Sequence, residues 1–157
     1  MIACVIMPSA LIFYDVSSTA EYTQASIMSA PDSPSSIHRV SDNLLYVSPA
    51  TPNSRVNTLM YDTVAHKWTW NIISGTLSTS HTADLQTTHD ACGRLWLSVG
   101  GLGIRIFDAA GSVSLYDWPL FYGTGAIVLT DKFDLYVTDF LNNRLSTYRP
   151  GIEQCTS

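Results

Sequence analysis

Short segments in which apolar and polar residues alternate, each ending close to an aromatic residue, recur along the chain. The first reads Leu-Ile-Phe-Tyr-Asp, and the copies fall at residues 11–15, 58–62, 105–108 and, less closely matched, 145–149. The aromatic residues of successive copies are 47, 46 and 41 positions apart. Alternation with a period of two, together with aromatic and β-branched residues, predicts β-strands. The chain is therefore expected to be a repeat of short strands.

A second repeated segment precedes the first in three of the copies. It carries a leucine followed by tyrosine or tryptophan, at residues 43–48, 93–98 and 134–139. Its aromatic residue stands 15, 11 and 12 positions before the aromatic residue of the segment that follows. This separation is expected of neighbouring antiparallel strands joined by a short loop. Turn-forming residues fall between the expected strands, at 90–93, 108–111 and 149–151.

A period of about 40–50 residues that holds several short strands is typical of β-propeller blades. No window shows the 3.6-residue stripe of an amphipathic helix. We therefore predict a single all-β domain, a partial β-propeller of about three and a half four-stranded antiparallel blades. The innermost strands are expected around residues 37–40, 84–88 and 126–130, and the outermost around 22–27, 67–73, 113–118 and 152–155. The blades then cover residues 1–29 (in part), 37–75, 82–118 and 124–157.

Two stretches resemble known propeller repeats. Residues 93–103, with a Leu-Trp strand and a Gly-Gly-Leu turn, resemble a two-component-regulator propeller repeat when read on to Phe107 and Asp108. Residues 134–139, together with the Asn-Asn-Arg at 142–144, resemble an NHL repeat. Both belong to a wider group of six-bladed-type propellers that includes gluconolactonases and streptogramin lyases. The resemblance implies the propeller fold and, commonly for such repeats, binding of a protein, peptide or glycan; motifs of this kind specify a fold better than a function.

Three and a half blades leave a propeller open. Closed propellers typically have four to eight blades, and an open one exposes sheet edges and a bare face. Either the chain is a fragment of a longer gene product that supplies the missing blades, or self-association with a second copy completes the ring. The first alternative is favoured, because terminal repeats normally carry capping features and none is recognisable in this sequence.

Composition narrows the classes of partner. Of the 157 residues, 46% are hydrophobic and 13% are charged, with a formal net charge of -5 and eight Lys and Arg in all. These values favour a folded chain and argue against nucleic-acid binding. The first 13 residues are apolar but lack Lys and Arg and are interrupted by Pro8, which disfavours a signal peptide. No segment approaches the roughly 20 apolar residues of a membrane span, and extracellular and cytoplasmic locations both stay open.

The three cysteines match no metal-binding pattern. Cys4, Cys92 and Cys155 lack the two-to-four-residue spacing of zinc ligands, and no pair of histidines stands near them. We therefore predict no metal site and no other cofactor. The odd count allows one disulfide with a free thiol, or three thiols in a reducing compartment, and three unreactive thiols are the favoured alternative.

No catalytic residue can be assigned. In the gluconolactonase family a metal is held by a Glu, Asn and Asp set at the centre of the propeller, but the only glutamates here, Glu21 and Glu153, fall on expected outermost strands. A streptogramin-lyase-like site needs histidines near the channel, and His38, His81 and His89 lie on or beside expected innermost strands. His89 adjoins Asp90, yet such a pair before a strand more often caps a turn than acts as a general base.

Binding is easier to support. The loops at residues 49–57, 99–104 and 139–144 are expected to emerge on one face of the propeller, where rigid strand ends would support them. Their candidate binding residues, which offer guanidinium and amide donors, are Arg55, Asn57, Asn142, Asn143 and Arg144. The last three also belong to the turn chemistry of the NHL repeat itself.

A non-enzymatic module that binds a protein, peptide or glycan on that face is our first hypothesis. A propeller hydrolase or lyase whose catalytic groups lie outside this chain is the second, and a structural spacer is the third.

Overall fold

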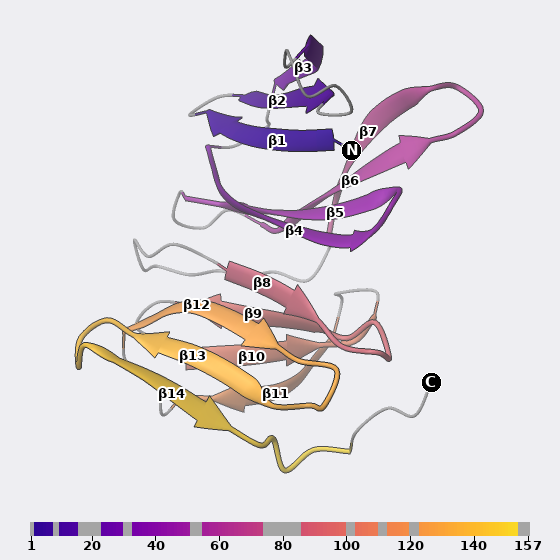
Figure 1. Cartoon of the computed structure of the whole chain (residues 1–157). Helices are drawn as coiled ribbons and strands as arrows, with labels where there is room; N and C mark the ends of the chain where they lie inside the picture. The colour runs from indigo at the N-terminus through magenta and orange to yellow at the C-terminus, as the bar shows by residue number, and fades with distance from the viewer. Residues whose placement is uncertain are drawn as a thin grey trace.

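In the computed structural model the residues that the structure describes form β-strands joined by turns and loops, and no helix occurs among them (Figure 1). Those residues are 2–7, 10–15, 23–29, 33–50, 55–73, 86–99, 103–109, 113–119 and 123–153. They therefore include no helix that could cross a membrane.

The strands make four antiparallel sheets, and each sheet takes its strands in chain order. The first sheet contains β1 (Ile2–Met7), β2 (Ala10–Asp15) and β3 (Thr23–Ser29). The second contains β4 (Pro34–Ser41), β5 (Leu44–Pro49), β6 (Asn57–Asp62) and β7 (Lys67–Ile72). The third contains β8 (Gln86–His89), β9 (Leu95–Val99), β10 (Gly103–Phe107) and β11 (Ser114–Trp118). The fourth contains β12 (Thr124–Leu129), β13 (Leu135–Asp139) and β14 (Arg144–Tyr148).

This arrangement confirms the all-β, partial-propeller prediction. The sheets follow one another along the molecule in chain order (Figure 1). Two differences from the sequence-based expectation concern the ends. The apolar N-terminal stretch supplies β1, which pairs residue by residue with β2. At the other end, residues 151–153 form no strand where an outermost strand was expected around 152–155, and residues beyond 153 lie outside the described ranges.

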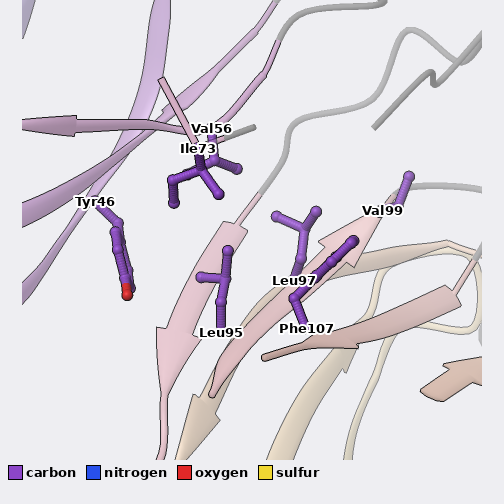
Figure 2. Close-up of a cluster of buried hydrophobic side chains, with 7 residues drawn as sticks. All are labelled: Tyr46, Val56, Ile73, Leu95, Leu97, Val99 and Phe107. Atoms are coloured by element: carbon purple, nitrogen blue, oxygen red, sulfur yellow. The ribbon is translucent and has the colours of Figure 1, made fainter. Parts of the chain in front are cut away.

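Each pair of consecutive sheets buries its own apolar cluster. Leu11 and Phe13 of the first sheet pack with Val47 and Leu59 of the second. The second and third sheets enclose the cluster drawn in Figure 2, which consists of Tyr46, Val56, Ile73, Leu95, Leu97, Val99 and Phe107. The third and fourth enclose Trp96, Ile104, Ile106, Ile127, Phe133, Leu135 and Val137. Because side chains alternate between the two faces of a strand, Leu95 of β9 packs toward the second sheet and Trp96 packs toward the fourth.

Asp90 organises the turn between β8 and β9. Its Oδ1 accepts hydrogen bonds from the backbone N–H groups of Cys92 (3.0 Å) and Arg94 (2.9 Å). Its Oδ2 accepts from Arg94 Nε (2.6 Å) and from the indole Nε1 of Trp96 (2.9 Å). Asp90 is buried, and burial of a carboxylate requires such charge-assisted bonds. Asp90 thus links the β8–β9 turn to Trp96, the largest fully buried side chain of the third sheet.

Cys92 lies on the exposed side of the same turn and belongs to a disulfide. The expectation of three free thiols was therefore wrong. Nearby, Arg94 Nη2 donates a hydrogen bond to the backbone carbonyl of Glu153 (2.9 Å), so the chain beyond β14 returns to this turn. Sequence spacing could not reveal this approach, because the two segments lie 59 positions apart.

Candidate functional site

The turn between β13 and β14 contains three of the five candidate binding residues, and Asp139 holds it together. Asp139 Oδ1 accepts a hydrogen bond from the backbone N–H of Asn142 (3.2 Å). Its Oδ2 accepts from Asn142 Nδ2 (2.8 Å) and from Arg144 Nε (2.9 Å). Asn143 has a φ of 49°, in the left-handed region that asparagine tolerates better than most residues. Asn142, Asn143 and Arg144 therefore shape the turn itself.

The same bonds fix the charges at this turn. They lower the pKa of Asp139, with the side-chain hydrogen bond from Asn142 as the largest cause and Arg144 contributing as well. The carboxylate consequently stays ionised at neutral pH and keeps Arg144 oriented. Within the described part of the chain, Arg144 is bonded through Nε alone, and its side chain is exposed. The rest of its guanidinium can therefore donate to a ligand.

Two exposed apolar residues, Phe140 and Leu141, stand in the same turn, and the sequence reasoning missed them. The backbone N–H of Phe140 donates to the carbonyl of Gly123 (3.0 Å), just before β12. Gly123 has a φ of 90°, and a Cβ added there would meet Leu141 Cγ at 2.5 Å. The turn therefore lies directly against Gly123, which is close to the Leu141 side chain and is bonded to the backbone of Phe140. The sequence signal that could have revealed this exposed apolar pair is the presence of two apolar residues between Asp139 and Asn142.

The remaining two candidates belong to the loop between β5 and β6. The side chain of Arg55 is exposed, whereas Asn57 is buried and donates from Nδ2 to the carbonyl of Arg55 (3.2 Å). Asn57 therefore stabilises the backbone at Arg55, just before β6. In the second and the fourth sheet alike, the second strand ends and the third strand begins at the left of Figure 1. The tip of the corresponding β9–β10 loop, residues 100–102, lies outside the described residues.

Two of the three candidate histidines meet between the second and third sheets. His38 Nε2 lies 2.7 Å from His89 Nδ1, and the two rings meet edge to face with centroids 4.9 Å apart. His38 also stacks on Tyr46, its register partner on β5. The third histidine, His81, is outside the described part of the chain.

Strand register explains why these histidines meet. His38 is paired with Tyr46, and His89 is paired with Leu95. Tyr46 and Leu95 belong to the same apolar cluster between the second and third sheets, and paired residues of adjacent strands share a face. His38 and His89 therefore face each other across the interface between the second and third sheets. The sequence placed both on or beside expected innermost strands, but that they face one another depends on the register.

His38 is neutral at ordinary pH. Burial, and secondly electrostatic repulsion from His89, lower the pKa of His38 to about 4. A neutral imidazole has one nitrogen that donates and one that accepts, so His38 can share one hydrogen bond with His89. The acidic neighbour Asp90 is already engaged by Arg94, Trp96 and the backbone of Cys92, so no described contact makes a His89–Asp90 catalytic pair.

A metal site finds no support in the described side chains. They contain no group of three or more His, Cys, Asp or Glu residues that could hold an ion, and catalytic zinc sites use three protein ligands. The two imidazoles at the His38–His89 contact fall short of that number.

Comparisons with known proteins give a likeness in fold only. No protein-family model matches the chain, and no curated protein matches its sequence. A solved structure similar to it is that of an auxiliary nutrient binding protein from Bacteroides thetaiotaomicron, with a TM-score of 0.63 and 15% sequence identity. The match covers 89% of this chain and 42% of that protein, so the chain spans less than half the length of its structural neighbour.

Proposed function

We propose that the chain is a non-enzymatic β-propeller module of the NHL and two-component-regulator type, which binds a protein, peptide or glycan at the end that carries the β13–β14 turn. The observation that carries the proposal is that one turn presents both an exposed aromatic ring, that of Phe140, and an exposed guanidinium, that of Arg144. Aromatic residues and arginine are the side chains most enriched at interface hot spots.

The turn is also preorganised for binding. Asp139 fixes Arg144 and Asn142, and the Gly123 carbonyl fixes the backbone of Phe140. A ligand would therefore bind without first ordering the turn, which reduces the entropic cost of association. Arg55, held just before β6 with the help of Asn57, extends the same end of the molecule. A neighbour of similar fold is described as a nutrient binding protein, which agrees with a binding role.

Peptide and glycan arrays probed with the whole chain would test this proposal, followed by titration of each bound compound. Phe140→Ala and Arg144→Gln are expected to weaken binding about tenfold or more each. Arg149→Gln is the matched control, because Arg149 is also an exposed arginine bonded to an aspartate, Asp134, but follows β14 at the opposite end. A loss of binding in the Arg149 variant equal to that in the Arg144 variant would contradict the placement of the site.

Enzymatic activity is tested separately. Assays with lactone and ester substrates, with and without added divalent metal ions, should show no turnover above background. Metal-dependent turnover would favour a propeller hydrolase or lyase instead. If neither Phe140→Ala nor Arg144→Gln changes the binding seen on the arrays, the end that carries the β13–β14 turn would be a structural spacer.

A further inference from the structure

Charges are distributed unevenly between the two ends of the second, third and fourth sheets. The turns that join first to second and third to fourth strands lie at the end opposite to the β13–β14 turn, because neighbouring strands run antiparallel. The described acidic residues of those turns are Asp42, Asp62, Asp90, Asp108, Asp131 and Asp134. The described loop residues at the end that carries the β13–β14 turn, 49–50, 55–56 and 139–144, contain only one acid, Asp139, beside Arg55 and Arg144. Within the strands, Asp117 is paired with Arg105.

The carboxylate of Asp139 is turned inward and is already bonded. Its side chain is 11% exposed, and its oxygens accept hydrogen bonds from Asn142 and Arg144. The side chain of Arg144, in contrast, is 60% exposed. A ligand that approaches this turn therefore meets a guanidinium first, and not an acid.

The way in which Asp139 holds Arg144 decides which donors stay available. Asp139 Oδ2 takes the Nε–H of Arg144 at 2.9 Å, and no other bond of this guanidinium occurs among the described residues. The N–H groups of Nη1 and Nη2, which form the outer edge of the planar fork, are left for a ligand. Two parallel N–H donors match the two oxygens of a carboxylate. Arg144 is thus arranged to bind a carboxylate through two hydrogen bonds.

The apolar pair in the same turn indicates what should accompany that carboxylate. Phe140 is 58% exposed and Leu141 is 62% exposed. An aromatic ring alone could stack on a sugar, but leucine offers no ring face, and an apolar pair gains most from covering by another apolar side chain. A ligand that carries a carboxylate close to an apolar side chain is a peptide rather than a glycan.

On the basis of the function proposed above, we propose that the ligand of the β13–β14 turn is an acidic peptide segment. An aspartate or glutamate carboxylate of the peptide takes the Nη1 and Nη2 donors of Arg144, and a neighbouring apolar side chain covers Phe140 and Leu141. The acidic turns at the opposite end of the sheets repel such a peptide, which favours its approach at the β13–β14 end although the chain carries a net charge of -5.

Titration of the whole chain with matched short peptides would test the acidic ligand. One peptide carries a glutamate between two leucines, and its partner carries glutamine at the same place. The glutamate peptide should bind about tenfold more tightly, because hydrogen bonds to a charged group are stronger than those to a neutral one. Arg144→Gln should remove this difference, and Arg144→Lys should keep only part of it, because an ammonium group lacks the planar fork. Arg149→Gln, at the opposite end, should keep the difference in full.

The outcomes separate the acidic ligand from the binding function on which it rests. Equal binding of the two peptides, or a preference that survives Arg144→Gln, would overturn the acidic ligand, even where Phe140→Ala still weakens binding as the proposed function expects. Tighter binding of a glycan that carries uronic acids than of the glutamate peptide would overturn the peptide. Absence of binding to every peptide and glycan would overturn the proposed function as well. Circular dichroism of each variant verifies that the strands still form.

Discussion

The third and fourth sheets share one repeat but differ in what covers them. In the third sheet Trp96 is fully buried, with its ring edge to face against Phe133 (centroids 5.7 Å apart) and its indole N–H bonded to Asp90. In the fourth sheet the equivalent Tyr136 is partly exposed. The same position therefore contributes to the core in one sheet and to the surface in the next. The local sequence determines where a strand forms, whereas the neighbouring sheet determines how much each side chain contributes to the free energy of unfolding.

Trp96→Ala should give the largest effect. It removes a fully buried aromatic ring and leaves a cavity between the third and fourth sheets, and such truncations cost about 3–5 kcal/mol. Urea unfolding followed by circular dichroism measures the loss. Trp96→Phe is the milder comparison, since it keeps an aromatic six-membered ring and loses the rest of the indole with its N–H bond to Asp90. A loss below about 1 kcal/mol for Trp96→Ala would contradict the burial described for the third sheet.

Asp90→Ala should be nearly as damaging. It leaves the guanidinium of the mostly buried Arg94 and the indole N–H of Trp96 without their carboxylate, and removing one partner of such a pair costs about 3 kcal/mol. Asp90→Asn keeps an acceptor for the backbone N–H groups and should cost less. Thermal unfolding of the two variants beside the wild type ranks them. Equal stability of all three would show that the turn does not depend on this carboxylate.

His38, at the interface between the second and third sheets, should make the stability of the fold sensitive to acid. The pKa of His38 is lowered to about 4 in the folded chain, from an ordinary value of 6.5. The unfolded chain therefore binds a proton that the folded chain excludes, and the free energy of unfolding falls as the pH drops from 6.5 towards 4. Urea midpoints across this range measure the slope.

One substitution separates this histidine from the carboxylates that titrate in the same range. His38→Gln should flatten the slope between pH 6.5 and 4, because it removes the group whose pKa is lowered in the folded chain. An unaltered slope in the His38 variant would assign the acid sensitivity to other groups. In the fourth sheet, Val128 holds the place that His38 holds in the second, because each is the register partner of the repeat's aromatic residue.

Tyr136→Ser should give the smallest effect. A partly exposed ring contributes less than about 1 kcal/mol, well below Trp96 at the same position. Thermal unfolding of the variant beside the wild type and Trp96→Ala provides the measurement. A loss as large as that of Trp96→Ala would contradict the exposure of Tyr136.

Much of the fold was predictable because its information is local. The segments containing Tyr61 and Phe107 became β6 and β10, and the segments containing Tyr46 and Trp96 became β5 and β9. Alternation and turn residues act over a few positions, so a single sequence reveals them. The expected strand around residues 152–155 does not form over residues 151–153, where Arg94 instead holds the carbonyl of Glu153.

The candidate site was only partly predictable for the same reason. Asn142, Asn143 and Arg144 were found by their motif, and the hydrogen bonds to Asp139 now explain their turn chemistry. Phe140 was missed, because an apolar residue next to a strand is more often buried than exposed. Whether the five predicted residues bind a ligand stays a prediction.

The sequence by itself determined the period, the strands and the turns, since hydrophobic alternation and aspartate-based turns depend on near neighbours. The tertiary structure alone decided which histidines meet and which aromatic residues are buried. Those outcomes depend on the register between strands and on the stacking of whole sheets, and both are set by contacts between residues far apart in the chain.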